Sequence, residues 1–258
     1  MRPGGRIALV IPARDEARLL PRVLASVPAS VWKVVVVDDD SRDTTWQVLR
    51  CWHDRRAVRL RAAQRLGVGG AILCGYREAL ALGADVAVVV AGDAQMDFSD
   101  LSRVIAPLSD GVADYVQGVR FVSGRPRGPM PPARVFGNRV LSACTSWASG
   151  EPVGDSQCGY TAASAPFLRH LLGLRLPHGY GFPAYVRLAA HRAGFRVHEV
   201  PVRALYGTEV SGIRPWCDPA LIAGRILGHG FARRFARWQS KVAGSFTPAA
   251  PRRAGEAA

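Results

Sequence analysis

The stretch ADVAVVVAGDAQMDFSD, from Ala84 to Asp100, decides the fold that we expect for this chain. It begins with the apolar run Val86 to Ala91, which is long enough for a strand buried on both faces, and then turns abruptly into the polar segment GDAQMD. Buried strands of this kind are typical of parallel sheets, and open α/β sheets bind ligands at the carboxyl ends of their strands. Carboxylate and amide oxygens there suit Mg²⁺ or Mn²⁺. Taken alone, the stretch also fits a strand followed by an Asp-rich turn.

Two apolar runs nearer the start of the chain end in acidic residues in the same way. Ile7 to Ile11 is expected to form a strand that Pro12 stops, and Asp15 and Glu16 after it to open a helix. Val34 to Val37 precedes three consecutive aspartates at positions 38–40. In a parallel sheet these clusters and the one after Ala91 reach the same edge. Gathering so many carboxylates costs repulsion unless a cation or a donor-rich ligand occupies the site. The three clusters together therefore favour a nucleotide and metal site over three unrelated turns.

The alternation of strand and helix patterns predicts an α/β fold. The sheet is expected to be mixed, mainly parallel and flanked by helices. We expect residues 1–215 to form this domain, residues 216–245 a basic amphipathic helical appendage, and residues 246–258, which are rich in Pro, Ala and Arg, a disordered tail. A chain of 258 residues with 48% hydrophobic residues can bury a core of that size.

The charge and the cysteines limit the classes of function. The net charge of +14 comes almost wholly from arginine and favours anionic partners, which include nucleotides, lipid phosphates, acidic membranes and nucleic acid. Five scattered cysteines without a C-x-x-C pair predict a reduced, cytoplasmic chain. No signal peptide and no apolar run of about 20 residues is present, so we expect no transmembrane helix.

The expected C-terminal helix has two contrasting faces. Its apolar face would carry Leu227, Phe231, Phe235 and Trp238, and its basic face Arg225, His229, Arg233, Arg237 and Lys241. This pattern is typical of a helix lying on an anionic membrane. It fits equally well a helix that packs on the core and exposes a basic back to solvent.

Several other functions fit the sequence less well. The glycine cluster at 67–70 does not complete G-x-G-x-x-G, since Ile72 stands at the final position, and no Walker A motif is present. A nucleotidyltransferase would carry a glycine-rich stretch with Lys or Arg after its first strand, where this chain has the acidic, glycine-free IPARDEA. A nucleic-acid-binding protein is permitted by the charge, but the acidic sheet edge would repel phosphates and no RNA-binding signature appears.

An ordered set of motifs resembles the family-2 glycosyltransferases over about the first 215 residues. The motifs are IPARDEA at 11–17, VVVDDDSRDTT at 35–45, GVGGA at 67–71, GDAQMD at 92–97, DYVQGVRF at 114–121, DSQCGY at 155–160 and EVPVR at 199–203. Within the family, the chain is most similar to polyprenyl-phosphate glycosyltransferases such as the dolichyl-phosphate mannose synthases. The resemblance implies a Rossmann-like GT-A fold, a UDP- or GDP-sugar donor, and Mg²⁺ or Mn²⁺.

The resemblance also implies roles for individual residues. Donor binding would fall to Pro12, Ala13, Glu16, Asp38, Asp39, Gly69 and Arg120. The metal would be held by Asp93 and Gln95, the acceptor by Gln157, Arg134 and Arg214, and the catalytic residues would be Asp155 and Asp93. One departure concerns the metal: the family's D-x-D is here Ala91-Gly92-Asp93, which lacks the first carboxylate and leaves open whether the metal is required.

The implied reaction is an inverting transfer of a mannose- or glucose-type sugar from the nucleotide to a polyprenyl phosphate. Asp155 would orient the acceptor, or act as the base if the acceptor is a hydroxyl. The helix at 134–148 and the C-terminal helix would form a lipid-facing surface, so that the enzyme lies peripherally on the cytoplasmic face of an anionic membrane and binds no nucleic acid. The alternatives are transfer to a non-lipid hydroxyl, and a non-catalytic protein that binds a nucleotide sugar or nucleic acid.

Overall fold

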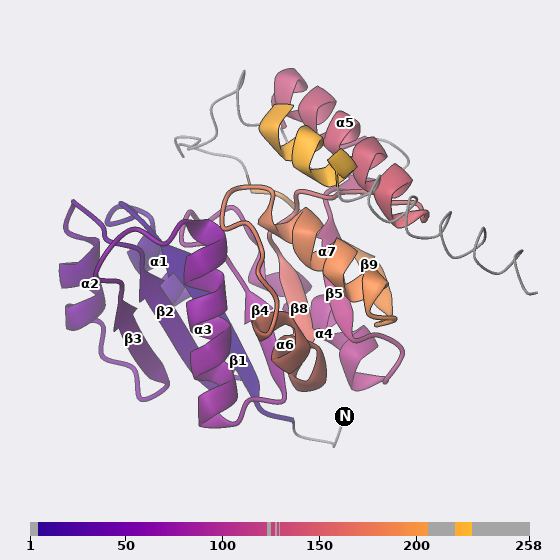
Figure 1. Cartoon of the computed structure of the whole chain (residues 1–258). Helices are drawn as coiled ribbons and strands as arrows, with labels where there is room; N and C mark the ends of the chain where they lie inside the picture. Colours follow the sequence, from indigo (N-terminus) through magenta and orange to yellow (C-terminus); the bar gives the residue numbers. More distant parts are fainter. Residues whose placement is uncertain (1–4, 123–124, 127, 129, 206–219, 229–258) are drawn as a thin grey trace, which may run out of the picture.

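A seven-stranded sheet forms the centre of the structure, a computed structural model that describes residues 5–122, 125–126, 128, 130–205 and 220–228 (Figure 1). The strand order is β3-β2-β1-β4-β8-β5-β9. The strands are β1 (Ile7–Ala13), β2 (Lys33–Asp38), β3 (Ala57–Arg61), β4 (Val86–Val89), β5 (Tyr115–Val119), β8 (Thr161–Ser164) and β9 (Val197–Pro201).

The sheet is mixed and mainly parallel, which confirms the sequence prediction. β1 pairs in parallel with β2 and β4, β2 with β3, and β5 with β9. β8 runs antiparallel to both of its neighbours, β4 and β5, so it alone among these strands is reversed. The carboxyl ends of β1, β2 and β4 consequently lie at one edge.

Helices cover both faces of the sheet (Figure 1). One face is covered by α3 (Val68–Leu82), α6 (Ala165–Leu172) and α7 (Phe182–Arg192). The other face is covered by α1 (Leu20–Ala25), α2 (Thr45–Cys51) and α4 (Leu101–Ser109). A short 3₁₀ turn, η1 (Phe98–Asp100), leads into α4. Side chains along a strand point alternately to the two faces. In β1, Leu9 and Ile11 therefore join the core on the α1 side, and Ala8 and Val10 join the core on the α3 side.

Two expected boundaries in the first unit differ from the structure. β1 does not stop at Pro12 but continues to Ala13. Pro12 lies beyond the end of β4, so its missing N–H costs no ladder bond, and its carbonyl accepts the N–H of Gly92 at 3.3 Å. α1 begins at Leu20 instead of near Glu16, because the residues between them form a loop tied to the one after β2.

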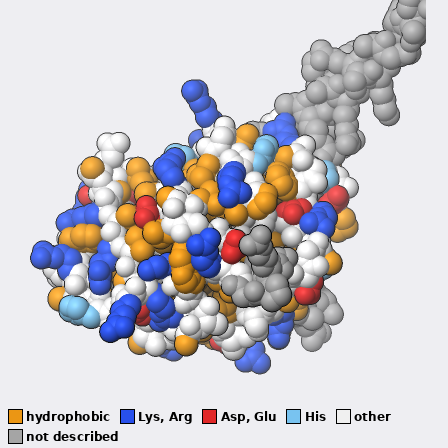
Figure 2. All heavy atoms as spheres, turned by 90° about the horizontal axis from the view of Figure 1, so that it is seen from below, with side chains coloured by type: hydrophobic (Ala, Val, Ile, Leu, Met, Phe, Trp, Pro, Cys, Tyr) orange, Lys and Arg blue, Asp and Glu red, His pale blue; other side chains and the backbone are white. Residues whose placement is uncertain are grey.

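A third layer contains α5 (Pro132–Ser149), which lies at the top of Figure 1 beside the helical residues 220–228. Both pack on α7 through the cluster Leu141, Ala148, Ala184, Tyr185, Leu188, Ile222 and Ile226. Before α5, where a sequence rich in Gly, Pro and Arg is typical of a loop, β6 (Phe121–Val122) and β7 (Arg125–Pro126) form a two-stranded ladder. In the view away from α5, Lys and Arg side chains are spread among apolar ones (Figure 2).

The expected C-terminal appendage is described only in part. Residues 220–228 are helical, whereas the rest of 216–245, with most of the aromatic and basic stripes, lies outside the described residues, as does the tail at 246–258. Within the part of the chain that the structure describes, no helix combines the length and the apolar character that crossing a bilayer requires.

Candidate functional site

The loops after β1, β2 and β4 share an unusual backbone feature. Asp15, Asp40 and Ala94 have φ angles of 54°, 56° and 60°, and they are the non-glycine residues with positive φ among those described. A left-handed conformation costs a non-glycine residue about 1–2 kcal/mol. Strain of this kind persists where the surrounding structure demands it, often at ligand sites. The strained positions thus coincide with the three acidic loops that the sequence predicted to meet.

Arg14 joins the first two of these loops. Its Nη1 donates to the carbonyl oxygens of Asp39 at 2.6 Å and Asp40 at 3.2 Å. Nearby, the backbone N–H of Glu16 donates to Oγ1 of Thr45 at 2.8 Å. Arg14 therefore fixes the geometry of the loop after β2 through the backbone carbonyls of that loop.

The carboxylates of Asp38 and Asp39 are both buried and both hold neighbouring chain segments. Asp39 accepts the backbone N–H groups of Leu66 at 2.5 Å and Gly67 at 3.0 Å. Oδ2 of Asp38 lies 3.3 Å from Nε of Arg61, although no well-oriented hydrogen bond reaches that oxygen within the described structure. These contacts join residues distant in sequence and were not predicted. The contact with the nucleoside that we expect of Asp38 and Asp39 stays a prediction.

The glycine cluster is required for close packing. Gly67 has a φ of 77°, and the N–H of Gly69 donates to the carbonyl of His178 at 2.8 Å. A Cβ on Gly69 would lie 2.5 Å from Cδ2 of Phe182, the first residue of α7. The cluster therefore lets the segment before α7 approach the start of α3. The donor contact expected of Gly69 stays a prediction.

Two carboxylates from different loops, Glu16 after β1 and Asp93 after β4, lie close enough to interact electrostatically. A Cβ on Gly92 would lie 3.6 Å from Cγ of Glu16, so the Glu16 side chain lies against the residue preceding Asp93. Burial, followed by the negative charge of Asp93, raises the pKa of Glu16 to about 7. Oδ1 of Asp93 accepts the backbone N–H of Gln95 at 3.1 Å, and this bond fixes the loop that carries the side chains of Asp93 and Gln95.

These residues fit a hard cation that binds together with a phosphate ligand. Among the described residues no three or more His, Cys, Asp or Glu side chains form a cluster that could hold a metal alone. Asp93 and Gln95 supply a carboxylate and an amide oxygen, and Ala91 supplies none. Mg²⁺ is usually held by one or two carboxylates together with water and substrate phosphates, so a small protein donor set is compatible with it.

Asp155 is fully buried and forms the centre of a polar network. Arg120 donates from Nε to Oδ2 at 2.7 Å and from Nη2 to Oδ1 at 3.0 Å, and Asn138 of α5 donates to Oδ1 at 2.6 Å. Burial acts to raise the pKa of Asp155, but the charge and hydrogen bonds of Arg120 outweigh it and lower that pKa. Both carboxylate oxygens already accept hydrogen bonds, which favours a positioning role for Asp155 over that of a general base.

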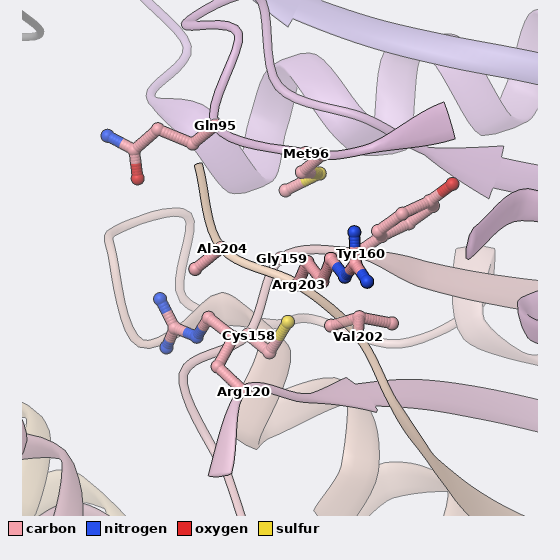
Figure 3. A pocket seen from close by; sticks show the side chains of 9 residues that line it. All are labelled: Gln95, Met96, Arg120, Cys158, Gly159, Tyr160, Val202, Arg203 and Ala204. Carbon is pink, nitrogen blue, oxygen red and sulfur yellow. The ribbon is translucent and has the colours of Figure 1, made fainter. Parts of the chain in front are cut away.

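A cavity of about 30 Å³ lies beside this network (Figure 3). In Figure 3 the ends of Gln95 and Arg120 point to the same side of it, with Ala204 between them, while the hydroxyl of Tyr160 points the opposite way. The volume is about that of one water molecule, so a sugar ring does not fit inside. Any ligand larger than water that contacts both Gln95 and Arg120 would therefore have to lie outside the cavity, on the side to which their ends point.

The segment after β9 completes the wall of this cavity. The N–H of Leu205 donates to the carbonyl of Gln95 at 2.9 Å, and Met96 and Ala204 form an isolated antiparallel bridge. Arg203 lines the cavity, and its N–H donates to Oδ2 of Asp100 at 2.7 Å. Arg203 is the last residue of the motif EVPVR, and its sequence context did not indicate a place at the cavity. Arg203 and Asp100 are 103 positions apart in the sequence, so no local pattern could have predicted the contact between them.

The residues expected on the acceptor side are only partly described. The backbone N–H of Gln157 donates to Oδ1 of Asp155 at 3.2 Å, so Gln157 lies at the network. Arg134 is half-buried in the first turn of α5, one turn before Asn138. Arg214 lies outside the described residues.

Known proteins are similar to this chain in both sequence and fold. A UDP-N-acetylglucosamine–dolichyl-phosphate N-acetylglucosaminyltransferase from Methanococcus voltae is 29% identical, covering 81% of this chain and 88% of that protein. An undecaprenyl-phosphate mannosyltransferase from Micrococcus luteus is 32% identical, covering 80% and 88%. The crystal structure of glucosyl-3-phosphoglycerate synthase from Mycobacterium tuberculosis with Mn²⁺, UDP and glucosyl-3-phosphoglycerate aligns with a TM-score of 0.63 at 19% identity, covering 89% and 80%.

The solved structure supports the expected GT-A fold, and the relatives support the expected resemblance. The sequence model of glycosyl transferase family 2 matches residues 8–169. This range runs from β1 into α6 and includes the acidic motifs after β1, β2 and β4. This match covers more than half of the chain, and it shows that the protein belongs to glycosyl transferase family 2.

Proposed function

We propose that this glycosyltransferase transfers a mannose- or glucose-type sugar, with inversion, from a nucleotide sugar to a polyprenyl phosphate. The observation that carries the proposal is that Gln95 and Arg120, with Arg120 held by buried Asp155, line one cavity and point to the same side of it, at the edge where β1, β2 and β4 end. The relatives named above, which act on dolichyl and undecaprenyl phosphates according to their names, support the acceptor class.

The donor would lie across the ends of β1 and β2. Pro12, Ala13, Glu16, Asp38 and Asp39 would surround the nucleoside, and Gly69 would line the same side. Asp93 and Gln95 would hold a divalent cation, Mg²⁺ or Mn²⁺. When bound, the cation neutralises charge on the leaving diphosphate. The M. tuberculosis synthase was solved with Mn²⁺ and UDP, which supports the binding of a divalent cation together with a nucleotide.

The reaction is a single displacement at the anomeric carbon. An oxygen of the acceptor phosphate forms the new bond to that carbon as the bond to the diphosphate breaks, and the nucleoside diphosphate leaves. A phosphate monoester with a second pKa of about 6 is largely dianionic at neutral pH, so its oxygen needs no base. Arg120 would bind phosphate oxygens, and Asp155 would orient Arg120. The acceptor would be bound by Gln157, Arg134 and Arg214.

The acceptor class implies attachment to an anionic membrane on its cytoplasmic side. The net charge of +14 supports contact with anionic lipid. Transfer to a non-lipid hydroxyl is less well supported, because such an acceptor needs a base and both oxygens of Asp155 already accept hydrogen bonds. A non-catalytic protein that binds a nucleotide sugar remains the second candidate, since Ala91 removes one carboxylate from the metal motif.

The test is a panel of UDP- and GDP-sugars with Mg²⁺ or Mn²⁺, with and without a short polyprenyl phosphate. We expect release of nucleoside diphosphate to rise sharply only when the lipid phosphate is present. Stabilisation by a donor without any release would favour the non-catalytic candidate. Absence of both binding and release across the panel would overturn the proposed function.

A further inference from the structure

The buried stretch of chain that carries Asp155 is held in place by side chains from other elements. Residues 150–160, all of which the structure describes, form neither helix nor strand between α5 and β8. Asp155 and Ser156 are nevertheless fully buried. Buried backbone N–H and C=O groups need hydrogen-bond partners, and outside regular structure side chains have to supply them. We refer to residues 152–158 as the Asp155 segment.

An ion pair between α7 and β9 supplies two of these partners. Nη1 of Arg187 lies 2.6 Å from Oε1 of Glu199, and Arg187 is only 5% exposed. Nη2 of Arg187 donates to the carbonyl of Pro152 at 3.2 Å. The backbone N–H of Gly154 donates to Oε1 of Glu199 at 3.0 Å. The pair therefore holds the backbone immediately before Asp155.

Gln117 of β5 extends this contact to the other end of the Asp155 segment. Its Oε1 accepts a hydrogen bond from Nη1 of Arg187 at 3.3 Å, and its Nε2 donates to the carbonyl of Cys158 at 3.4 Å. Gln117 is fully buried. The motifs DYVQGVRF and EVPVR thus contribute Gln117 and Glu199 to one network around the Asp155 segment.

We propose that Arg187 and Glu199 are positioning residues for the transfer reaction, which hold the Asp155 segment and thereby fix the orientation of Arg120. The inference rests on the proposed function, in which Arg120 binds phosphate oxygens. Asp155 bonds Arg120 through both of its carboxylate oxygens, so a shift of Asp155 also moves the guanidinium. A misplacement of about 1 Å at a reacting site can cost about a hundredfold in rate.

The burial of the ion pair argues against a purely stabilising role. Taking a guanidinium and a carboxylate out of water costs free energy that their attraction often does not recover, and an apolar pair of similar volume is often as stable. Arg187 instead bonds groups from β9, from β5 and from the Asp155 segment. Bonds from one rigid guanidinium to three parts of the chain fix how those parts lie relative to one another.

A variant without the ion pair separates positioning from stability. Arg187→Met/Glu199→Leu replaces the pair with apolar side chains, and its melting temperature should lie within about 5 °C of the wild type. Its kcat for transfer to a short polyprenyl phosphate should fall at least about thirtyfold. The Kd for UDP or GDP with Mn²⁺ should stay within about twofold, because β8 and β5 separate β9 from the strands that carry the expected donor site.

The control variant, Asp114→Asn, weakens an ion pair at the other end of the same two strands. Asp114 precedes β5, and its Oδ2 lies 3.0 Å from Nε of Arg196, which precedes β9. This variant should keep the wild-type kcat. A comparable loss of kcat in the control would show that any weakened contact between β5 and β9 slows the reaction, and would refute a specific role of Arg187 and Glu199.

Hydrogen exchange measured by mass spectrometry reports on the Asp155 segment without any substrate. The N–H of Gly154 loses its acceptor in the double variant, while those of Val153 and Ser156 keep their bonds to hydroxyls of α5. Exchange in the peptide that covers 153–156 should become at least about tenfold faster. The control should exchange like the wild type, and unchanged exchange in the double variant would contradict the inference.

A double-mutant cycle with Asp155→Asn shows whether the ion pair acts through Asp155. Adding Arg187→Met/Glu199→Leu to Asp155→Asn should lower kcat by less than about threefold further, because the group through which the pair acts is already changed. Losses that multiply would mean that the pair acts independently of Asp155. That result, or a wild-type kcat in the double variant, would overturn the inference.

The inference and the proposed function fail in different ways. A wild type that transfers sugar to no polyprenyl phosphate would refute the proposed function, whereas faster exchange in the double variant would still support the anchoring of the Asp155 segment. If the double variant melts early, Glu199→Gln and Glu199→Asp replace it. Glu199→Gln keeps the reach to Gly154 and Glu199→Asp keeps only the charge, so Glu199→Gln should retain the higher kcat. Equal rates or the opposite order would contradict positioning by this side chain.

Discussion

Glu16 offers a direct test of the electrostatics at the sheet edge. Its pKa of about 7 in the folded protein, compared with 4.5 ordinarily, means that folding favours the protonated carboxyl. The contribution of the protonated Glu16 carboxyl to the free energy of unfolding is fully present below pH 4.5 and is lost as the pH rises through about 7. A difference of this size corresponds to about 3 kcal/mol for a buried group. Since Glu16 is only partly buried, solvent screening reduces it to about 1–2 kcal/mol.

Glu16→Gln removes the charge while keeping nearly the same shape. At pH 8 we expect the variant to be more stable than the wild type by about 1–2 kcal/mol in the absence of metal and nucleotide, and at pH 4.5 we expect the difference to be much smaller. Urea unfolding followed by tryptophan fluorescence at both pH values measures this change in the free energy of unfolding. Glu78→Gln, on α3 and away from the site, is the control.

The two pH values make the result decisive. A gain that is the same at pH 4.5 and pH 8, or a variant less stable than the wild type at pH 8, would refute the assignment of the raised pKa to Glu16. We also expect Glu16→Gln to lower kcat/KM for the donor by at least about tenfold. Higher stability with lower activity is the pattern of a group retained for ligand binding at a cost in stability.

Further predictions concern the other contacts of the site. Asp155→Asn should lower the melting temperature and reduce kcat by about a hundredfold or more, because Arg120 loses its ionic partner, and Asp155→Glu should not restore the rate. Ala94→Gly should raise the free energy of unfolding by about 0.5–1 kcal/mol by relieving the positive φ, as urea unfolding would report; destabilisation would contradict the strain. Gly69→Ala should destabilise by about 1–3 kcal/mol, because its Cβ meets the first ring of α7, and an unchanged melting temperature would refute that packing. Ala91→Asp should tighten Mn²⁺ binding with UDP by about tenfold in calorimetry, and unchanged affinity would place the cation elsewhere.

The sequence alone determined the buried strands β1, β2 and β4, their order of appearance and the edge at which the acidic loops that follow them meet. Apolar runs such as Val34 to Val37 are local signals, and parallel strands connected by helices must end at the same edge. The family also followed from the order of short motifs. The expected end of β1 at Pro12 was wrong. Pro12 lies beyond the end of β4, so the N–H that proline lacks is not needed for a hydrogen bond to that strand.

Only the tertiary structure decided which groups touch within that edge. The antiparallel strand β8, the pairing of Arg120 with Asp155 and the meeting of Glu16 with Asp93 join residues distant in sequence, so no local pattern reports them. These neighbours and burial then change the chemistry of the two carboxyls: Arg120 lowers the pKa of Asp155 despite its burial, whereas burial and the charge of Asp93 raise the pKa of Glu16 to about 7. The residue types were visible in the sequence, but their protonation states depend on neighbours and solvent access that exist only after the chain has folded.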